Sequence, residues 1–397
     1  MRAGLGGAIG LVVAMGCSLW GCAGLSLGSR DRVEMGVEGP YRPRRLASLR
    51  WRLPLATLTD LDARSRDRAV PVIDASTARV IVGGMDGAVH AIRLSDHGEV
   101  WRFQALGSVE GEMVQVGREL YFGADDGALY SVSADTGQMR WRVATNAEVV
   151  RAPVVTERTV YFVNGEDTVL AVDRANGEGR WRVHRDPPGG ITSSGHSGLV
   201  LHGRCLYAGF SDGRVQCLDP EDGSVRWERD TSTDDEQVEG ANEAHRTIDV
   251  DTTPVLLGDT LYAASITAGL YALDPESGNV RWRAESVRDV YALSTDGRDL
   301  FAASATRGLS RIDPTDGHTL WARSFGGGAI GQPTPWGPLL IVPVSDQSMW
   351  LLRASDGEVL EGLGAEGTNA APAIFGRWMF FVSVRGTLNA WFFEPRG

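Results

Sequence analysis

The stretch from Asp249 to Glu285 reads DVDTTPVLLGDTLYAASITAGLYALDPESGNVRWRAE. It holds four runs of about five residues that are rich in Val, Leu, Tyr and Trp, with Gly, Asp, Pro or Ser between them. Runs of this length between turn residues are typical of an antiparallel four-stranded meander, and none is long enough for a helix. A lone meander leaves two edges and two faces uncovered, so neighbouring units are expected.

The same unit recurs along the chain. Each copy ends on Asp or Ala, then Gly, then a tryptophan, and these tryptophans are Trp101, Trp141, Trp181, Trp227, Trp282 and Trp321. Their spacings are 40, 40, 46, 55 and 39 residues, so loop insertions account for the differences. Self-similarity near 40 residues with four strands per unit predicts a β-propeller.

Two recurring residue types have structural roles in this repeat. The Asp that ends the third strand of a unit can accept hydrogen bonds from the amides of the next turn. These residues are Asp173, Asp219, Asp274 and Asp313. The tryptophan indoles are expected to fill the gaps between adjacent blades and to donate their N–H to backbone carbonyls.

The last unit is incomplete, and the start of the chain supplies what is missing. A seventh unit runs from Pro333 to Leu360, with Leu360 near the tryptophan position, and an eighth from Ala371 to Phe393 has three strands. The segment Leu49–Leu53 repeats the fourth-strand pattern, and we expect its Trp51 to be buried as Trp101 is. We therefore predict an all-β fold: an eight-bladed propeller of four-stranded antiparallel blades, closed by an N-terminal strand that pairs with the last blade.

Composition and motifs argue against chemistry. The chain has 397 residues, 43% of them hydrophobic, which suffices for a large core, and its net charge of −12 argues against a nucleic-acid surface. The seven histidines show no metal-site spacing on a helix, no CxxC occurs, and no Gly-x-Ser-x-Gly stands at a strand-to-helix turn. We expect no enzyme activity, no catalytic residue, no metal site and no cofactor.

The N-terminus has the pattern of a targeting segment. Residues 1–21 are predicted to be a lipoprotein signal peptide, because Leu5 to Leu19 is apolar but too short for a membrane span. Leu19-Trp-Gly-Cys22 resembles the lipobox of bacterial lipoproteins, although Trp20 is bulkier than that pattern prefers. Cys22 is the expected site of acylation (palmitate) and Cys17 a weaker alternative; an ordinary signal peptide with an incidental cysteine is the other interpretation. No Asp follows Cys22 closely, which by the usual sorting rule implies the outer membrane.

The remaining chain divides into a tether and the propeller. Residues 22–47 carry the acylated cysteine and a segment of Gly, Ser, Arg and Pro without apolar periodicity, so we predict a flexible tether. Its arginines either contact anionic lipid or are simply solvated. Residues 48–397 are predicted to form the propeller.

Two cysteines lie on neighbouring strands of the fourth blade. Cys205 is expected on the second strand and Cys217 on the third, and an exported chain meets an oxidising compartment. They form either a disulfide or two buried free thiols, because the sequence does not fix the register of the strands.

Two connections are much longer than a turn. Residues 229–246 between blades four and five include Asp234, Asp235, Glu236, Glu239 and Glu243, and residues 186–197 connect blades three and four. Long loops on a rigid scaffold often carry binding surfaces, and a solvated loop is the alternative.

The repeat resembles two known families. The unit at residues 272–282, ALDPESGNVRW, is similar to the tryptophan-docking repeat of quinoprotein alcohol dehydrogenases. The chain is much shorter than those enzymes and lacks their adjacent Cys-Cys pair and roofing loops, so quinone and calcium binding are not implied.

The second resemblance covers the whole chain from about Trp51. The lipobox, the eight blades and the segment Asp249-Val-Asp-Thr-Thr-Pro-Val255 resemble the outer-membrane protein assembly factor BamB family. In that family the segment borders the surface that meets BamA, so the resemblance implies Asp249 and Asp251 as candidate partner contacts; turn capping is the alternative role. The family's Leu-x-Leu-Arg-Gly element is replaced here by Gly190-Ile-Thr-Ser-Ser-Gly195, without the arginine.

These observations predict a non-enzymatic scaffold. We expect a lipid-anchored protein on the periplasmic face of the outer membrane, which binds a BamA-like barrel protein and assists nascent outer-membrane proteins. The alternative is a stand-alone propeller that binds a small ligand in its central channel, or another envelope protein. Converging carboxylates and amides on the innermost strands would favour the ligand.

Overall fold

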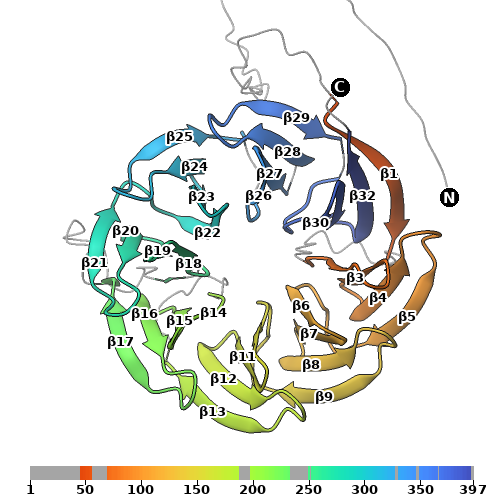
Figure 1. The fold of residues 1–397 in the computed structure, drawn as a ribbon, viewed down its shortest axis with the longest axis horizontal. Helices are drawn as coiled ribbons and strands as arrows, with labels where there is room; N and C mark the ends of the chain where they lie inside the picture. Colours follow the sequence, from red (N-terminus) through yellow and green to blue (C-terminus); the bar gives the residue numbers. More distant parts are fainter. Residues whose placement is uncertain are drawn as a thin grey trace, which may run out of the picture. The chain divides into compact units, whose positions relative to one another are not determined.

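The computed structural model describes residues 45–55, 69–186, 197–232, 249–250, 252–326, 330–345, 348–364 and 366–394. These residues form thirty-two β-strands and no α-helix. The strands build eight separate four-stranded antiparallel sheets, arranged as blades around a ring (Figure 1). The predicted eight-bladed propeller is therefore confirmed.

Each of the first seven blades uses four consecutive strands, which run from the centre of the ring to its rim. Blades one to three are β2 (Val72–Asp74), β3 (Arg79–Gly83), β4 (Ala88–Arg93) and β5 (Glu99–Gln104); β6 (Met113–Val116), β7 (Glu119–Ala124), β8 (Ala128–Ser133) and β9 (Met139–Ala144); and β10 (Val154–Val155), β11 (Thr159–Val163), β12 (Thr168–Asp173) and β13 (Gly179–His184). Blades four and five are β14 (Val200–His202), β15 (Cys205–Gly209), β16 (Arg214–Leu218) and β17 (Val225–Asp230); and β18 (Val255–Leu257), β19 (Thr260–Ser265), β20 (Gly269–Leu273) and β21 (Val280–Ala284). Blades six and seven are β22 (Val290–Thr295), β23 (Leu300–Ser304), β24 (Gly308–Ile312) and β25 (Thr319–Arg323); and β26 (Thr334–Trp336), β27 (Leu339–Val344), β28 (Ser348–Arg353) and β29 (Val359–Leu363).

Blade eight joins the two ends of the described chain. It contains β30 (Ala373–Phe375), β31 (Trp378–Val382), β32 (Thr387–Phe393) and, on the outside, β1 (Ala47–Pro54). β1 pairs antiparallel with β32 from Ala47 opposite Phe393 to Pro54 opposite Thr387 (Figure 1). This strand supplies the missing fourth position, as the sequence predicted.

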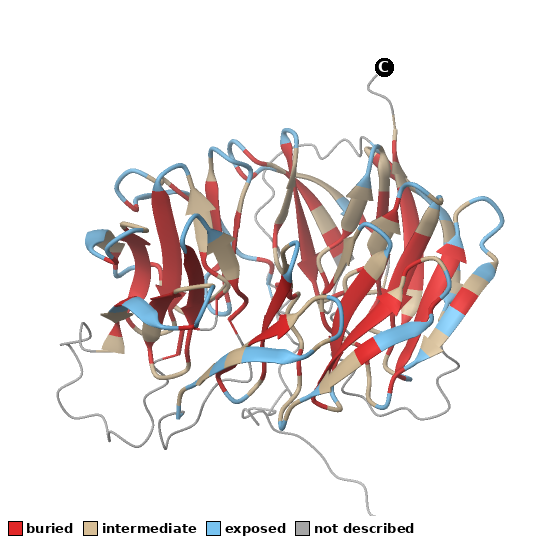
Figure 2. Cartoon of the chain, turned by 60° about the horizontal axis from the view of Figure 1, so that its bottom comes forward, coloured by how far each residue is buried: buried red, intermediate tan, exposed pale blue. Residues whose placement is uncertain are grey.

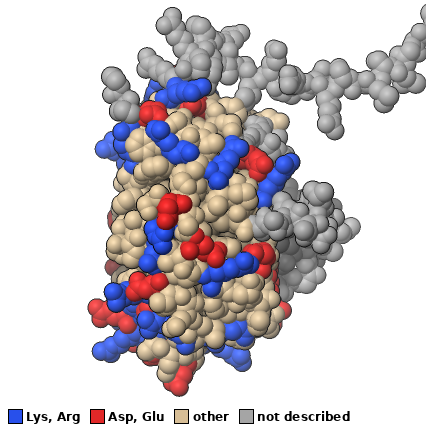
Figure 3. All heavy atoms as spheres, turned by 90° about the vertical axis from the view of Figure 1, so that its right-hand side faces the viewer, with Lys and Arg blue, Asp and Glu red and all other residues tan. Residues whose placement is uncertain are grey.

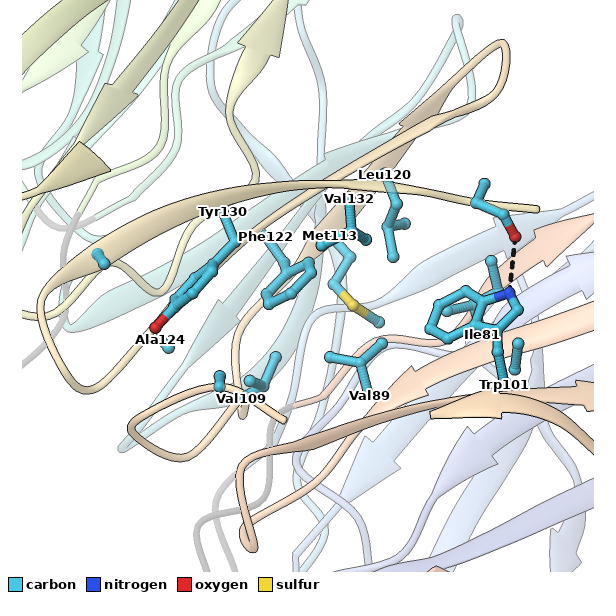
Figure 4. Packing of buried hydrophobic residues seen from close by; sticks show 14 residues of the cluster. Ile81, Val89, Trp101, Val109, Met113, Leu120, Phe122, Ala124, Tyr130 and Val132 are labelled. Carbon is cyan, nitrogen blue, oxygen red and sulfur yellow. Dashed lines mark hydrogen bonds between the residues drawn. The ribbon is translucent and has the colours of Figure 1, made fainter. Parts of the chain in front are cut away.

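The core lies between blades. The two middle strands of a blade are almost wholly buried, whereas most residues of the outer strand are exposed or half-buried (Figure 2). Apolar side chains on facing sides of neighbouring blades form one cluster per interface, such as the cluster of Ile81 and Val89 with Leu120 and Phe122 (Figure 4). A blade therefore has no complete core of its own and depends on both neighbours.

Six consecutive blade interfaces share the same tryptophan contact. Each indole N–H donates to a backbone carbonyl at the end of the third strand of the next blade. The pairs are Trp101 with Ala134 at 2.8 Å, Trp141 with Arg174 at 2.9 Å, Trp181 with Pro220 at 3.1 Å, Trp227 with Pro275 at 3.0 Å, Trp282 with Pro314 at 3.1 Å and Trp321 with Ala354 at 3.1 Å. Figure 4 shows the first of these bonds. The expected role of the tryptophans in blade packing is confirmed.

A glycine in the next blade makes room for each indole. Gly137 has φ of 72°, and a Cβ at this position would lie 2.6 Å from the Trp101 ring. Glycine is thus required both for the left-handed backbone and for the close approach of the ring. The same arrangement holds at the five following interfaces, where the glycines are Gly177, Gly223, Gly278, Gly317 and Gly357.

The interface between blades seven and eight departs from this pattern. A bulge in the outer strand places Glu361, not Leu360, opposite Leu351, which is the position of tryptophan in the complete repeats. The Glu361 carboxylate accepts hydrogen bonds from the backbone N–H of Leu46 and, at 3.2 Å, of Ala47. Burial raises the pKa of the Glu361 carboxyl, against the lowering effect of these two amide bonds. An acceptor is needed here because the start of β1 offers N–H groups where other blades offer a carbonyl.

The interface between blades eight and one also departs from it. Trp51 lies at the tryptophan position, opposite Ala390, but the glycine of the next turn is replaced by His97, with φ of 60°. The Trp51 and His97 rings lie 4.4 Å apart between centroids. Trp51 is half-buried, whereas Trp101 is 8% exposed, so the expected equal burial of the two is not observed. The imidazole takes up space that a glycine would leave to the indole.

The repeated aspartates cap the turns between third and fourth strands. Asp173, Asp219, Asp274 and Asp313 each accept backbone N–H bonds from the following turn, at 2.9 to 3.2 Å. In three of these blades the arginine before the tryptophan also bonds the aspartate, as Arg281 does with Asp274 at 2.9 Å. The predicted turn-capping role is confirmed.

This capping predicts acid sensitivity. The hydrogen bonds from Arg281 and Ser277 lower the pKa of Asp274 from 3.8 to about 2. Because the folded-state pKa is depressed, the ionised Asp274 stabilises the fold above about pH 4, and this contribution is lost as the pH falls from about 4 to 2. In thermal melts, Asp274→Asn should lower the melting temperature at pH 7 and lower it much less at pH 2, where the pH has reached the folded-state pKa of about 2. Glu276→Gln is the control, since the Glu276 carboxylate accepts no hydrogen bond in the described part. An equal effect of Asp274→Asn at both pH values would contradict the assignment.

Charges of both signs are mixed on the outer surface. The chain contains no lysine, so every positive side chain in Figure 3 is an arginine. Arginines and carboxylates are interspersed on this side of the ring (Figure 3). Exposed ion pairs of the blades include Arg102 with Asp86 at 2.9 Å and Arg93 with Asp96 at 2.6 Å. Such exposed pairs contribute little stability each, and they leave no large field of one sign here.

Candidate partner-binding site

The two long connections lie in the chain before and after blade four: the first leads from blade three to blade four and the second from blade four to blade five. The first connection leaves after Asp186 and returns at Ser197; the second leaves after Ser232 and returns at Asp249. Both connect the end of an outer strand to the start of the innermost strand of the next blade. These strand ends lie at the end of the ring that also carries the turns between second and third strands. We call this end the insertion face.

The two returning segments are hydrogen-bonded to each other. The Ser197 hydroxyl donates to the Thr252 carbonyl at 3.0 Å, and the Gly198 N–H donates to the Thr253 hydroxyl at 3.0 Å. A Cβ at Gly198 would lie 2.5 Å from the same Thr253 oxygen, so a glycine is required for this approach. The described residues at which the two connections return are thereby held side by side on the ring, although Ser197 and Thr252 are 55 positions apart.

Thr252 anchors the second segment to blade five. It is fully buried, and its hydroxyl accepts from the Ala264 N–H at 3.1 Å and donates to the Ala264 carbonyl at 3.3 Å. Sequence reasoning singled out the aspartates on either side of Val250 and missed this threonine. The signal available was the Thr-Thr-Pro that immediately precedes a strand.

Of the two predicted contact residues, the structure describes Asp249 but not Asp251. Asp249 is 1% exposed, and its carbonyl accepts from the Ile266 N–H at 3.0 Å. Its buried side chain therefore belongs to the attachment of the segment rather than to its outer surface. Asp251 lies outside the described residues, as do Gly190–Gly195 and the acidic residues of the second connection.

A charged network surrounds the departing ends of the connections. Arg185 pairs with Asp212 at 2.6 Å and with Glu228 at 3.0 Å, while Arg214 pairs with Asp212 and Asp230, both at 2.9 Å. The hydrogen bond to Asp212 raises the pKa of Arg214. Burial opposes ionisation of Asp230, but bonds from Ser232 and the charge of Arg214 outweigh it and lower its pKa. The network holds the last described residues before each connection in place.

A disulfide links two strands of the same blade. Cys205 on β15 and Cys217 on β16 are bonded, with their Cα atoms 5.1 Å apart, and both side chains are buried. Tyr207 lies opposite Cys217 in the register, so the two cysteines are diagonal neighbours on one face of the sheet.

Removal of this disulfide should weaken blade four. Closing a loop with a sequence separation of 12 residues stabilises a fold by about 3 kcal/mol in the chain-entropy model, and the paired replacement Cys205→Ala with Cys217→Ala should cost roughly that amount. Chemical denaturation with and without a reductant measures it. The reductant should lower the midpoint of the natural chain and leave that of the double variant unchanged; an equal response of both would contradict a role of the disulfide.

The innermost strands offer little to a polar ligand. Among the eight strands nearest the axis, only β2 carries a carboxylate, and its Asp74 is 4% exposed and accepts from Ser76 and Thr77 of the following turn. In the described part of the chain, no cluster of three or more His, Cys, Asp or Glu is placed to hold a metal ion.

The predictions about the N-terminus fall on the part of the chain that the structure does not describe, residues 1–44. Cys22, the signal peptide at residues 1–21 and nearly all of the tether at residues 22–47 belong to this part, whereas β1 begins at Ala47. Over the described residues no helix has the length and hydrophobicity of a membrane span.

The fold and the repeated indole contact define a class: propellers whose blades dock through tryptophan onto the next blade. The family model of the outer membrane protein assembly factor BamB matches residues 48–137, 85–323 and 267–378, which together cover most of the chain. The chain belongs to the BamB family, and the predicted family resemblance is confirmed.

Individual relatives agree with this placement. An outer membrane protein assembly factor BamB of Pseudomonas aeruginosa is 26% identical over 203 residues, or 51% of this chain. The matched segments span 52% of that relative and 29% of another curated relative, less than two thirds of their length.

Solved structures show a similar fold. The BamB of Moraxella catarrhalis superposes with a TM-score of 0.71 over 87% of this chain and 100% of its own, at 20% identity. A quinohemoprotein alcohol dehydrogenase of Comamonas testosteroni gives a TM-score of 0.66 at 13% identity over 89% of this chain and 78% of its own. The same ring thus occurs in an assembly factor and in an enzyme, so the fold alone does not decide the function.

Proposed function

We propose that this protein is a non-enzymatic scaffold in the assembly of outer-membrane proteins. The observation that carries the proposal is the match of a BamB family model across nearly the whole ring, including the segment that follows the second connection. A propeller to which both long connections are attached at one face suits a bridging role, because variable loops on a stiff scaffold form adaptable binding surfaces.

The insertion face around blades four and five is the surface we assign to the partner. The partner is a BamA-like barrel protein, and nascent outer-membrane proteins are a second class that the complex handles. The second connection includes Asp234, Asp235 and Glu236, so the contacting surface of the partner is expected to be basic. Asp251 is kept as a candidate contact and Asp249 as part of its attachment.

The position in the cell follows from the proposed anchor. Acylation at Cys22 would hold the protein at the periplasmic face of the outer membrane, because acyl chains give stable attachment to a membrane. The tether would let the ring reach a membrane partner.

Co-purification from outer membranes tests this function. The full-length protein, carrying a C-terminal affinity tag, should recover a BamA-like barrel protein after mild detergent extraction. A variant in which a Gly-Ser linker replaces residues 233–248 should recover much less and keep its melting temperature. Failure of the natural chain to recover any barrel protein would count heavily against the proposal.

A further inference from the structure

A hollow of about 180 Å³ lies between blade six and the connection that leads to it from blade five. Val287 and Arg288, in the connection from β21 to β22, line one side of it. Ala302, Ser310 and Ala322, on β23, β24 and β25, line the other. The hollow reaches the insertion face, because its lining includes Arg307 in the turn between the second and third strands of blade six.

The hollow exists because blade six lacks three large side chains. Ala302, Ser310 and Ala322 lie opposite one another in the register of the sheet. The corresponding row of blade two is Phe122, Tyr130 and Arg142.

In blade two this space is filled. The Phe122 and Tyr130 rings are stacked at 5.4 Å, side by side in the interface (Figure 4). The Arg142 guanidinium lies 5.5 Å above the Tyr130 ring. Blade five repeats the pair, with Arg283 lying 5.6 Å above Tyr271.

The space left in blade six therefore fits a ring. Its size is comparable to that of an engineered cavity of about 150 Å³ that binds benzene. Unlike that cavity, this one carries hydroxyl groups, from Ser304, Ser310 and Thr319. A phenol or phenyl group would restore a contact of the kind that Tyr130 makes in blade two and Tyr271 in blade five.

Two arginines give the hollow a positive charge. Arg288 donates to the Glu285 carbonyl at 2.8 Å and Arg307 to the Ser286 carbonyl at 2.6 Å. Within the described residues neither guanidinium is paired with a carboxylate. The nearby Asp289 carboxylate accepts from the Thr306 hydroxyl at 2.6 Å, and Glu285 pairs with Arg283 at 3.5 Å.

We infer that this hollow is a binding site for an aromatic ring that carries a carboxylate. The ring enters between Ala302, Ser310 and Ala322, and the carboxylate meets Arg288 and Arg307. Such a group occurs in free aromatic acids and at the end of a peptide whose last residue is aromatic. The site goes beyond the proposed scaffold function, and no step of the inference depends on that function.

Backbone hydrogen bonds connect the hollow with the candidate partner-binding site. The Asp249 carbonyl accepts from the Ile266 N–H, the Ile266 carbonyl from the Asp289 N–H, and the Asp289 carbonyl from the Ala305 N–H, each at 3.0 Å. The two sites thus share the insertion face and are one blade apart.

Calorimetric titration of the mature chain with N-acetyl-tyrosine tests the site. A probe of this size should bind with a Kd in the roughly millimolar range. N-acetyl-tyrosinamide, which lacks the carboxylate, should bind at least about 10-fold more weakly. An acetylated Gly-Gly-Tyr peptide distinguishes the sources: tighter binding than N-acetyl-tyrosine supports a peptide end, and equal binding supports a free aromatic acid.

Variants that copy blade two provide the control. Ser310→Tyr should fill the hollow and abolish binding without lowering the melting temperature. Ser310→Ala should leave binding intact. Ala322→Arg serves the same purpose if Ser310→Tyr fails to fold. Arg307→Gln should remove the preference for the acid over the amide. Absence of saturable binding to the natural chain, or binding that survives Ser310→Tyr in the folded protein, would overturn the site.

Discussion

A mature chain that begins at residue 56, and therefore lacks β1, is expected to lose at least about 5 kcal/mol of stability, a large part of what a typical domain has. β1 supplies the whole outer edge of blade eight, with seven paired positions against β32. Its Trp51 and Leu53 also cover the apolar cluster that includes Phe380 and Ala390. Without them the sheet edge and this cluster are exposed together, so the melting temperature should fall by more than about 10 °C.

A chain that begins at residue 41 is the matched control. It keeps β1 and the amides of Leu46 and Ala47 that Glu361 binds, so its melting temperature should equal that of the chain beginning at residue 23. Trp51→Ala should cost about 2–3 kcal/mol, below the usual 3–5 kcal/mol, because Trp51 is only half-buried. If the chains beginning at residues 23, 41 and 56 melted alike, the closure of the ring by β1 would be wrong.

Trp101→Ala should cost about 3–5 kcal/mol, the usual range for a packed tryptophan. The indole is 8% exposed, packs on Gly137, and donates to the Ala134 carbonyl at 2.8 Å. Its loss leaves a cavity between blades one and two and an unpaired carbonyl. The free energy of unfolding from urea titration measures the effect.

Met139→Ala is the control for this substitution. Met139 is also on an outer strand, two residues before Trp141, but its side chain is 55% exposed, so the cost should stay below about 0.5 kcal/mol. Similar costs for Met139 and Trp101 would mean that the indole contact does not hold the blades together.

The fold was predictable because six consecutive blades repeat the same turn and the same tryptophan. The ring of eight and its closure by the segment around Trp51 followed from spacing and from one missing strand. The sequence did not predict whether Cys205 and Cys217 are bonded, because a shift of one residue in the strand register decides whether the two side chains lie on the same face of the sheet.

The irregular blade interfaces were harder to predict from the sequence. In blade six the tryptophan, Trp321, stands four residues after the turn glycine, Gly317. The same count from Gly357 in blade seven gives Glu361, whereas the tryptophan position predicted from the sequence, near Leu360, is one residue too early. The hollow in blade six required knowledge of which residues share a row, since Ser310 and Ala322 are 12 positions apart and unremarkable in sequence. The candidate partner surface was located by resemblance, while the anchoring by Thr252 depends on contacts between distant segments.

Site-specific photo-cross-linking in intact cells tests the central claim most directly. A photoreactive residue at position 267, in a turn on the insertion face of blade five, should form an adduct with a BamA-like barrel protein. The same residue at position 276, at the opposite end of β20, is the matched control and should form none. Adducts with that barrel protein from position 276 and not from position 267, or from neither position, would contradict the proposed partner surface.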